Sequence, residues 1–242
     1  MITRDRLRGG AAELVVVIIG VLIALSADRW VQALDDRDRE RTQLGWIASD
    51  LEADSAMLAY AIEASEQRIA YVRTLLDAAD RPGPVPPDEI QDFIRAFIRV
   101  GWSTSPTFAS ATWSEMVASG DLSLIRDTEL RRDLSGYYHY QDAFLQVEAN
   151  RDRLGRELED RTIALYPYLS LDADALGDRE PIPEDVSPAQ VARLLDRTRD
   201  PDSEMRGLIS YAGTASAVRI WLYRDFMDRV SELLVRVRRA AS

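Results

Sequence analysis

Hydrophobic and polar positions alternate along this chain with the period of an amphipathic helix, and no segment shows the strict two-residue alternation of a strand. Between residues 28 and 80 one apolar face is formed by Leu44, Ile47, Leu51, Leu58, Ile62, Ile69, Val72 and Leu76. Proline is absent from residue 28 to residue 81, and the segment RPGPVPP follows. The pattern therefore predicts one long helix over about 28–80 that ends at these prolines.

The next helix is predicted to be broken. It starts at Asp88, is interrupted by GWSTSPTF and resumes through ASATWSEMVAS until Gly120. Glycine at that place is typical of a helix C-terminus, because it adopts a left-handed conformation without steric penalty. Asp127 is a suitable N-cap for a third helix, which should end near Pro167.

A capping box begins at Ser187, with proline at the first helical position, and predicts a short helix to about Thr198. A fourth long helix is expected over about 202–239. Four long segments, the second of them broken, indicate an all-α fold in which a four-helix-bundle-like domain follows an up-down-up-down order. The C-terminal RVRRAAS should then return to the end of the bundle at which the first helix enters.

The most apolar stretch lies before this domain, in AAELVVVIIGVLIALSADRW. Residues 11–27 have the minimum length for a helix that crosses a bilayer, and Trp30 follows at the position of an interfacial aromatic. Arginines precede the stretch, so the positive-inside rule places residues 1–10 in the cytoplasm and residues 28–242 in the periplasm of a bacterium. The sequence thus predicts a single transmembrane helix in the inner membrane.

A cleaved signal peptide is the alternative, because it also has a basic start and an apolar middle. The tripeptide Ala24-Leu25-Ser26 resembles a weak cleavage site. Against cleavage, no helix breaker separates the apolar stretch from the segment that follows, and the helical pattern continues through it. We therefore expect a retained anchor that extends directly into a helical stalk.

Three residues of the anchor are candidates for membrane or oligomer contacts. Glu13 lies near the cytoplasmic end, where it either extends toward the lipid headgroups or occupies a polar oligomer interface. Gly20 and Ala24 have the small-xxx-small spacing that allows close approach of two helices. This spacing is common in membrane helices and is weak support for a dimer.

Composition excludes several classes of function. The formal net charge is −11, and an acidic domain repels phosphate backbones, so we expect no nucleic acid partner. The chain has no cysteine and a single histidine, His139, which leaves zinc sites and nucleophile–histidine pairs without their usual residues. No glycine-rich phosphate loop occurs. We expect neither a metal nor a cofactor, and no catalytic residues.

One polar group interrupts the apolar faces of the bundle. Arg219 falls on the apolar face of the fourth long helix, and Glu148 and Arg151 fall on the face of the third. Counted from the connection between these two helices, the three residues are level. They form either an ion pair that fixes the register of the helices or a polar core that binds a small anion.

Two segments resemble a family of bacterial single-pass membrane proteins that is described only as a domain of unknown function. The segments are AELVVVIIGVLIALSADRW and SGDLSLIRDTELRRDLSGYY. The matching positions are Glu13, Trp30, Gly120, Leu122, Leu124, Ile125, Leu130, Leu134, Tyr137 and Tyr138. Ala12 departs from the glycine of the family pattern. The resemblance implies a retained inner-membrane anchor and a helical exported domain, and it implies no activity.

These observations favour a membrane-anchored periplasmic interaction or accessory subunit without catalytic activity. Its expected partners are the lipid bilayer and either another protein or further copies of the chain. The alternative hypothesis is a periplasmic ligand-binding sensory domain. With only ten cytoplasmic residues predicted, such a sensor would have to act through a partner.

Overall fold

The computed structural model describes residues 4–165 and 186–242, and within them it does not place the side chains of residues 4–19, 24, 150–155, 159 and 162–165. In this part of the chain every regular element is helical and no strand occurs, so the predicted all-α class is confirmed. The elements are α1 (Arg4–Asp80), α2 (Ile90–Arg99), α3 (Ala111–Ser119), η1 (Asp121–Leu124), α4 (Thr128–Leu165), α5 (Pro188–Arg199) and α6 (Glu204–Ala241).

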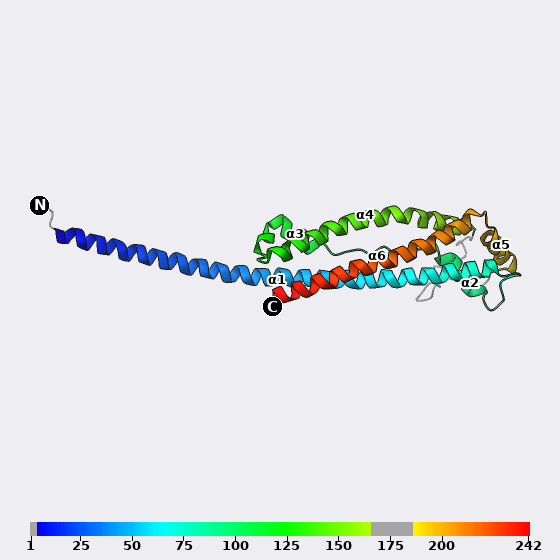
Figure 1. Ribbon diagram of the computed structural model, residues 1–242, viewed down its shortest axis with the longest axis horizontal. Coiled ribbons are helices and arrows are strands. Elements are labelled where there is room, and N and C mark those ends of the chain that lie inside the picture. The colour runs from blue at the N-terminus through cyan, green and yellow to red at the C-terminus, as the bar shows by residue number, and fades with distance from the viewer. Residues whose placement is uncertain (1–3, 166–185) are drawn as a thin grey trace, which may run out of the picture.

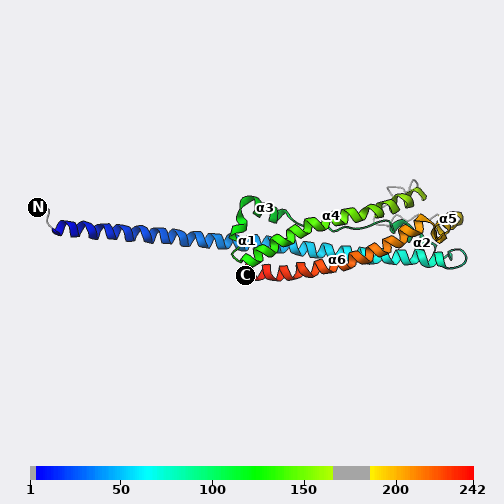
Figure 2. The ribbon, with the colours of Figure 1, turned by 45° about the horizontal axis from the view of Figure 1, so that its top comes forward.

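Three long helices and one broken return segment form the bundle (Figure 1). Helix α1 runs outward, and α6 returns antiparallel along it. The descending segment between α1 and α4 consists of α2, the extended residues 102–110 and α3 (Figure 2). The up-down-up-down order is as predicted. The middle of the descending segment, residues 102–110, is non-helical, because the proline and small polar residues of GWSTSPTF do not support a helix.

Helix α1 is longer than the predicted stalk and continues without a break from Arg4. Its first half projects from the bundle, and the packed part begins at Leu44 (Figure 1). The predicted span 11–27 falls mostly on residues whose side chains lie outside the described set. Within the part of the chain that the structure describes, no helix is both long enough and apolar enough to cross a membrane.

The local signals at the helix ends are present as predicted. Asp127 Oδ1 accepts hydrogen bonds of 2.9 Å from the backbone N–H groups of Glu129 and Leu130, which makes Asp127 the cap of α4. Gly120 has φ +83° at the end of α3. Ser187 and Gln190 form the capping box of α5. Helix α2 begins at Ile90, two residues later than expected, since a turn at the preceding prolines comes first.

The hydrophobic core has two parts. The proximal part, near the projecting helix, lies between α1, α4, α6 and the short α3, and the distal part lies between α1, α2, α5 and the start of α6. Phe108, from the extended segment 102–110, packs between the long helices with its ring centroid 5.8 Å from Phe144 and 5.1 Å from Phe226. The extended segment is therefore an integral part of the core.

Arginine side chains hold the distal end of the bundle together. The Arg199 guanidinium donates to the backbone carbonyls of Ala79 (3.2 Å), Arg81 (2.6 Å) and Gly83, at the C-terminus of α1. Arg206 forms an ion pair of 2.8 Å with Asp80. Carbonyls at a helix C-terminus lack intrahelical donors and carry partial negative charge, so these arginines stabilise the end of α1.

The turn before α4 lies beside the projecting part of α1. The backbone N–H of Arg126 donates to Glu40 Oε1 at 2.8 Å, and the Arg126 side chain donates to the carbonyl of Ala33 at 3.3 Å. Ile125 is 1% exposed in the proximal core, while its neighbours Leu122 and Leu124 are partly buried. The turn therefore packs inward against the proximal core, most clearly at Ile125.

Candidate functional site: buried polar groups in the bundle

Eight polar or charged residues are buried among the described side chains of the bundle. They are Asp54, Ser65, Arg68, Gln141, Glu148, Thr198, Ser216 and Arg219. An isolated buried charge is strongly unfavourable, so a charged residue among them is expected to have a hydrogen-bonded partner or a functional role. The charged residues among them make three separate groups of contacts.

The first group joins α4 and α6. Arg219 Nε donates to Glu148 Oε2 at 2.8 Å, and the Tyr223 hydroxyl donates to the same oxygen at 2.7 Å. The side chains of Arg219 and Glu148 are 3% and 1% exposed. The ion pair inferred from residue counting is therefore present, and the level alignment of the two helices is confirmed. The Arg151 side chain lies outside the described set.

This arrangement explains how α6 tolerates a charged residue on its apolar face. Helix packing aligns Arg219 with a carboxylate, and Tyr223, one turn further along α6, adds a second donor. The opposite charges of the two buried groups compensate each other. The guanidinium thus already has an anion, and this contact favours the structural role over the alternative of a bound anionic ligand.

The second group involves Arg68 in the middle of α1. Its side chain is 4% exposed, and it donates to the backbone carbonyls of Val100 at 2.6 Å and Gly101 at 3.3 Å. Val100 is the C-cap of α2. A buried cation at a helix C-terminus neutralises the partial charge of the terminal carbonyls. Arg68 therefore fixes the place where α2 ends and the extended segment begins.

The third group surrounds Asp54, which sequence reasoning did not identify. Asp54 is 1% exposed. Its Oδ1 accepts a hydrogen bond of 2.7 Å from the backbone N–H of Ala109, and its Oδ2 accepts bonds of 2.5 Å from the Tyr137 hydroxyl and 3.4 Å from Gln141 Nε2. The carboxylate thus connects α1 with the extended segment and with α4.

Burial dominates the protonation chemistry of this third group. Desolvation raises the pKa of the Asp54 carboxyl, the hydrogen bonds from Tyr137 and Ala109 oppose the rise, and the charge of Asp50 adds to it. Desolvation also raises the pKa values of Tyr137 and Tyr138 well above the ordinary value, with the nearby aspartates contributing. Both phenols are therefore neutral at physiological pH.

The candidate membrane and oligomer contacts lie on the projecting half of α1. Gly20 is exposed, and a β-carbon added there would meet nothing within 4 Å. The side chains of Glu13 and Ala24 lie outside the described set. The described apolar side chains around them are open to solvent, with Ile23 at 64% and Trp30 at 65% exposure.

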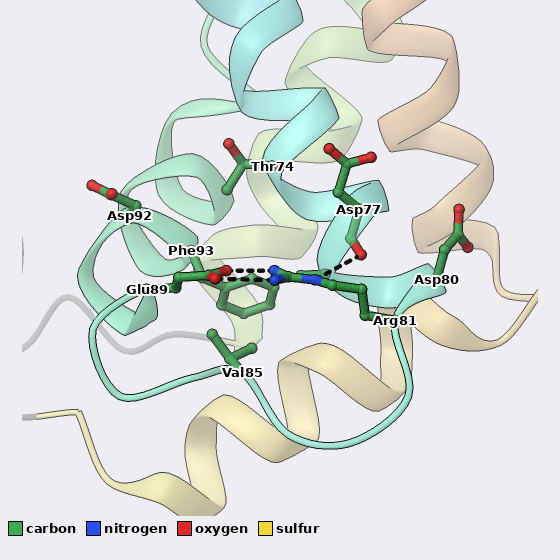
Figure 3. Close-up of a pocket in the computed structure, with 9 residues that line it drawn as sticks. Thr74, Asp77, Asp80, Arg81, Val85, Glu89, Asp92 and Phe93 are labelled. Atoms are coloured by element: carbon green, nitrogen blue, oxygen red, sulfur yellow. Dashed lines mark hydrogen bonds and ion pairs between the residues drawn. The ribbon is translucent and has the colours of Figure 1, made fainter.

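A surface groove of about 650 Å³ lies at the distal end, between the last turns of α1 and the start of α2. The Arg81 guanidinium and the Glu89 carboxylate face each other across it in two parallel contacts, one of them 3.0 Å long (Figure 3). This ion pair lowers the pKa of Glu89. The described residues contain no group of three or more acidic or histidine side chains arranged to hold a metal ion.

No protein-family model, curated protein or solved structure matches this chain. The resemblance to the single-pass membrane family therefore stays a prediction based on the residues that carry it.

Proposed function

We propose that the protein is a membrane-anchored helical interaction subunit: residues 11–27 anchor it in the bacterial inner membrane, and the bundle faces the periplasm. The observation that carries this proposal is the projecting half of α1. A helix that leaves the bundle with a run of exposed apolar side chains requires a second apolar environment, which a bilayer supplies.

The exposure of individual side chains supports this proposal. Val21, Leu22, Ile23 and Leu25 are each more than 50% exposed, and they continue the apolar run of the sequence. The charged residues Asp28 and Arg29 end this run, and Trp30 comes directly after them. An apolar run that ends in charged residues beside an aromatic side chain is typical of the place where a membrane helix enters water.

The bundle itself offers a surface for a protein partner. Tyr211, Val218 and Trp221 lie on the outward side of α6, separated by seven and three residues and therefore on one helix face. Their exposures are 38%, 41% and 68%. Tryptophan and tyrosine are enriched where binding energy concentrates in protein interfaces. We therefore assign the partner-facing surface to this side of α6.

Because the chain has no cysteine, single-cysteine labelling tests the topology. Thr3→Cys and Ser242→Cys would be expressed separately and treated in spheroplasts with a membrane-impermeant maleimide. We expect labelling of the C-terminal cysteine in intact spheroplasts and of the N-terminal cysteine only after lysis. Recovery of the protein in the soluble fraction would contradict the retained anchor. So would an intact mass that corresponds to a chain starting at Ala27 or Asp28.

The same membranes test the interaction. After crosslinking and detergent extraction, Trp221→Ala should reduce the recovery of the partner. Trp46→Ala removes a tryptophan of similar exposure from α1 and serves as the matched control. If the two variants recover the same amount of partner as the wild type, the outward side of α6 is not the interaction surface.

A further inference from the structure

Two carboxylates lie one helical turn apart in the proximal half of the bundle and have no basic partner. Asp50 and Asp54 both belong to α1, and Asp54 is fully buried. The arginines of α6 at this level are engaged elsewhere, since Arg238 pairs with Glu52 at 2.6 Å and Arg236 pairs with Asp133. The negative charges of the buried Asp54 and the half-buried Asp50 therefore repel each other without a compensating cation.

The remaining groups around the pair are neutral. The extended segment contributes the Ala109 N–H, and α3 contributes Trp113, whose ring stacks on Tyr138 with centroids 4.7 Å apart and an angle of 11° between the planes. Helix α4 contributes Tyr137, Tyr138 and Gln141. From α6, the Phe226 ring lies 5.5 Å from the ring of Tyr137, measured between centroids.

Two polar atoms at this place are buried without a hydrogen-bond partner: Asp50 Oδ2 and the Tyr138 hydroxyl. Tyr138 is only 4% exposed. Burial raises the pKa of the Tyr138 hydroxyl, and the charges of Asp50 and Asp54 add to the rise. Unsatisfied buried polar atoms beside uncompensated negative charge indicate that the cluster accommodates a further positive species.

We propose that this cluster is a proton-binding site: Asp54, with Asp50 one turn away, takes up one proton in the folded bundle at pH values where exposed aspartates have lost theirs. The site also holds the extended segment against α1. Release of the proton restores the repulsion between Asp50 and Asp54 beside that segment, so the stability of the proximal end of the bundle depends on pH.

The contacts of Asp54 suit both protonation states. When the carboxylate is ionised, the Tyr137 hydroxyl donates to Oδ2 across 2.5 Å. When Oδ2 carries the proton, it donates to the Tyr137 oxygen across the same distance. The Ala109 N–H donates to Oδ1 in either state. Proton uptake thus needs no movement of heavy atoms, and it removes the repulsion between Asp50 and Asp54.

The direction of the pH dependence follows from the raised pKa of Asp54. A carboxyl whose pKa is higher in the folded state binds its proton more tightly there than in the unfolded chain. Its contribution to stability is complete below the ordinary aspartate value of 3.8 and is lost as the pH rises through the folded value. The bundle should therefore become less stable on the alkaline side, opposite to ordinary acid denaturation.

Thermal unfolding of the full chain in detergent, followed between pH 4.5 and 8.5, tests the proposal. Asp54→Asn imitates the protonated carboxyl, and Glu63→Gln removes an exposed charge from the same helix as the matched control. The Tm of the wild type and of the control should fall with rising pH, by about 3–5 °C per pH unit where the slope is steepest. The Tm of Asp54→Asn should stay level over that interval.

Asp50→Asn provides an independent test if Asp54→Asn does not fold. It removes the neighbouring charge, so the fall in Tm should begin at a lower pH than in the wild type. Equal slopes for the wild type and the Asp54→Asn and Asp50→Asn variants would overturn the proposal. So would an increase in Tm with CaCl₂ or MgCl₂ at pH 8 that is absent in Asp54→Asn, because a metal ion would then be the occupant.

Discussion

Removal of the Arg219 guanidinium is the most direct test of how α4 and α6 are aligned. In Arg219→Ala, the Glu148 carboxylate stays in a place where it is 1% exposed and loses a charged donor at 2.8 Å. The Tyr223 hydroxyl, at 2.7 Å, remains as a neutral donor. The carboxylate must then be protonated, or water must enter the bundle, and both outcomes destabilise the folded state.

The size of the effect follows from this burial. Breaking a buried ion pair by removing one partner costs about 3–5 kcal/mol, and solvent does not screen this pair. For a chain of about this length, 1 kcal/mol corresponds to roughly 2–4 °C in Tm. Arg219→Ala should therefore lower the Tm by about 6–20 °C. Replacing both charges in Glu148→Leu/Arg219→Met should recover most of the loss, because no buried charge is then left.

The measurement is thermal and urea unfolding of the full chain in detergent, followed by circular dichroism at 222 nm. Arg239→Ala is the control, since it removes an arginine from the exposed end of the same helix. The single variants Glu148→Leu and Arg219→Met, together with the double variant and the wild type, form a cycle that isolates the coupling between the two side chains. Equal Tm values for Arg219→Ala and Arg239→Ala, or a double variant less stable than both single ones, would refute this account of the pair.

Two further substitutions test the turn that precedes α4. Gly120→Ala places a β-carbon at φ +83° and should destabilise the fold by about 1–2 kcal/mol. Gly136→Ala lies in open space inside α4 and serves as the control, which should stabilise the fold by up to about 1 kcal/mol. Urea titrations that rank the two variants the other way would contradict the turn geometry. Ile125 is 1% exposed, so Ile125→Ala should lower the free energy of unfolding by about 2–5 kcal/mol in the same titrations. The loss should be larger than in Leu124→Ala. An unchanged urea midpoint for Ile125→Ala would show that the turn is not packed.

The parts of the fold that depend on local chemistry could be predicted from the sequence. The cap at Asp127, the left-handed Gly120 and the capping box at Ser187 each arise from contacts within a few residues. The pairing of Glu148 with Arg219 could also be predicted, because both residues interrupt apolar helix faces and their distances from the connection between the helices differ by only about one helical turn. In these cases the interacting residues lie close together in the sequence, or their alignment follows from counting residues along two neighbouring helices.

The polar groups on α1 could not be predicted in this way. Asp54 lies three residues after Leu51 and four before Leu58, so its place on the core face is visible in the sequence. Its partners, however, are Ala109 and Tyr137, 55 and 83 residues further along the chain. The same applies to Arg68, whose carbonyl partners appear only when α2 ends beside it. Residue spacing gives no information about such contacts until the path of the extended segment is known.

Because α1 is continuous, the number of residues in the stalk sets the distance between the bundle and the proposed membrane exit. At 1.5 Å per residue, the 53 residues from Ala27 to Asp80 set the distal tip about 80 Å from the proposed membrane exit. Each residue also turns the helix by about 100°, so the length of the stalk and the direction in which the bundle faces are tied together. Adding seven residues between Asp35 and Thr42 would raise the bundle by about 10 Å with almost the same heading, whereas adding five would swing the outward side of α6 by about 140°.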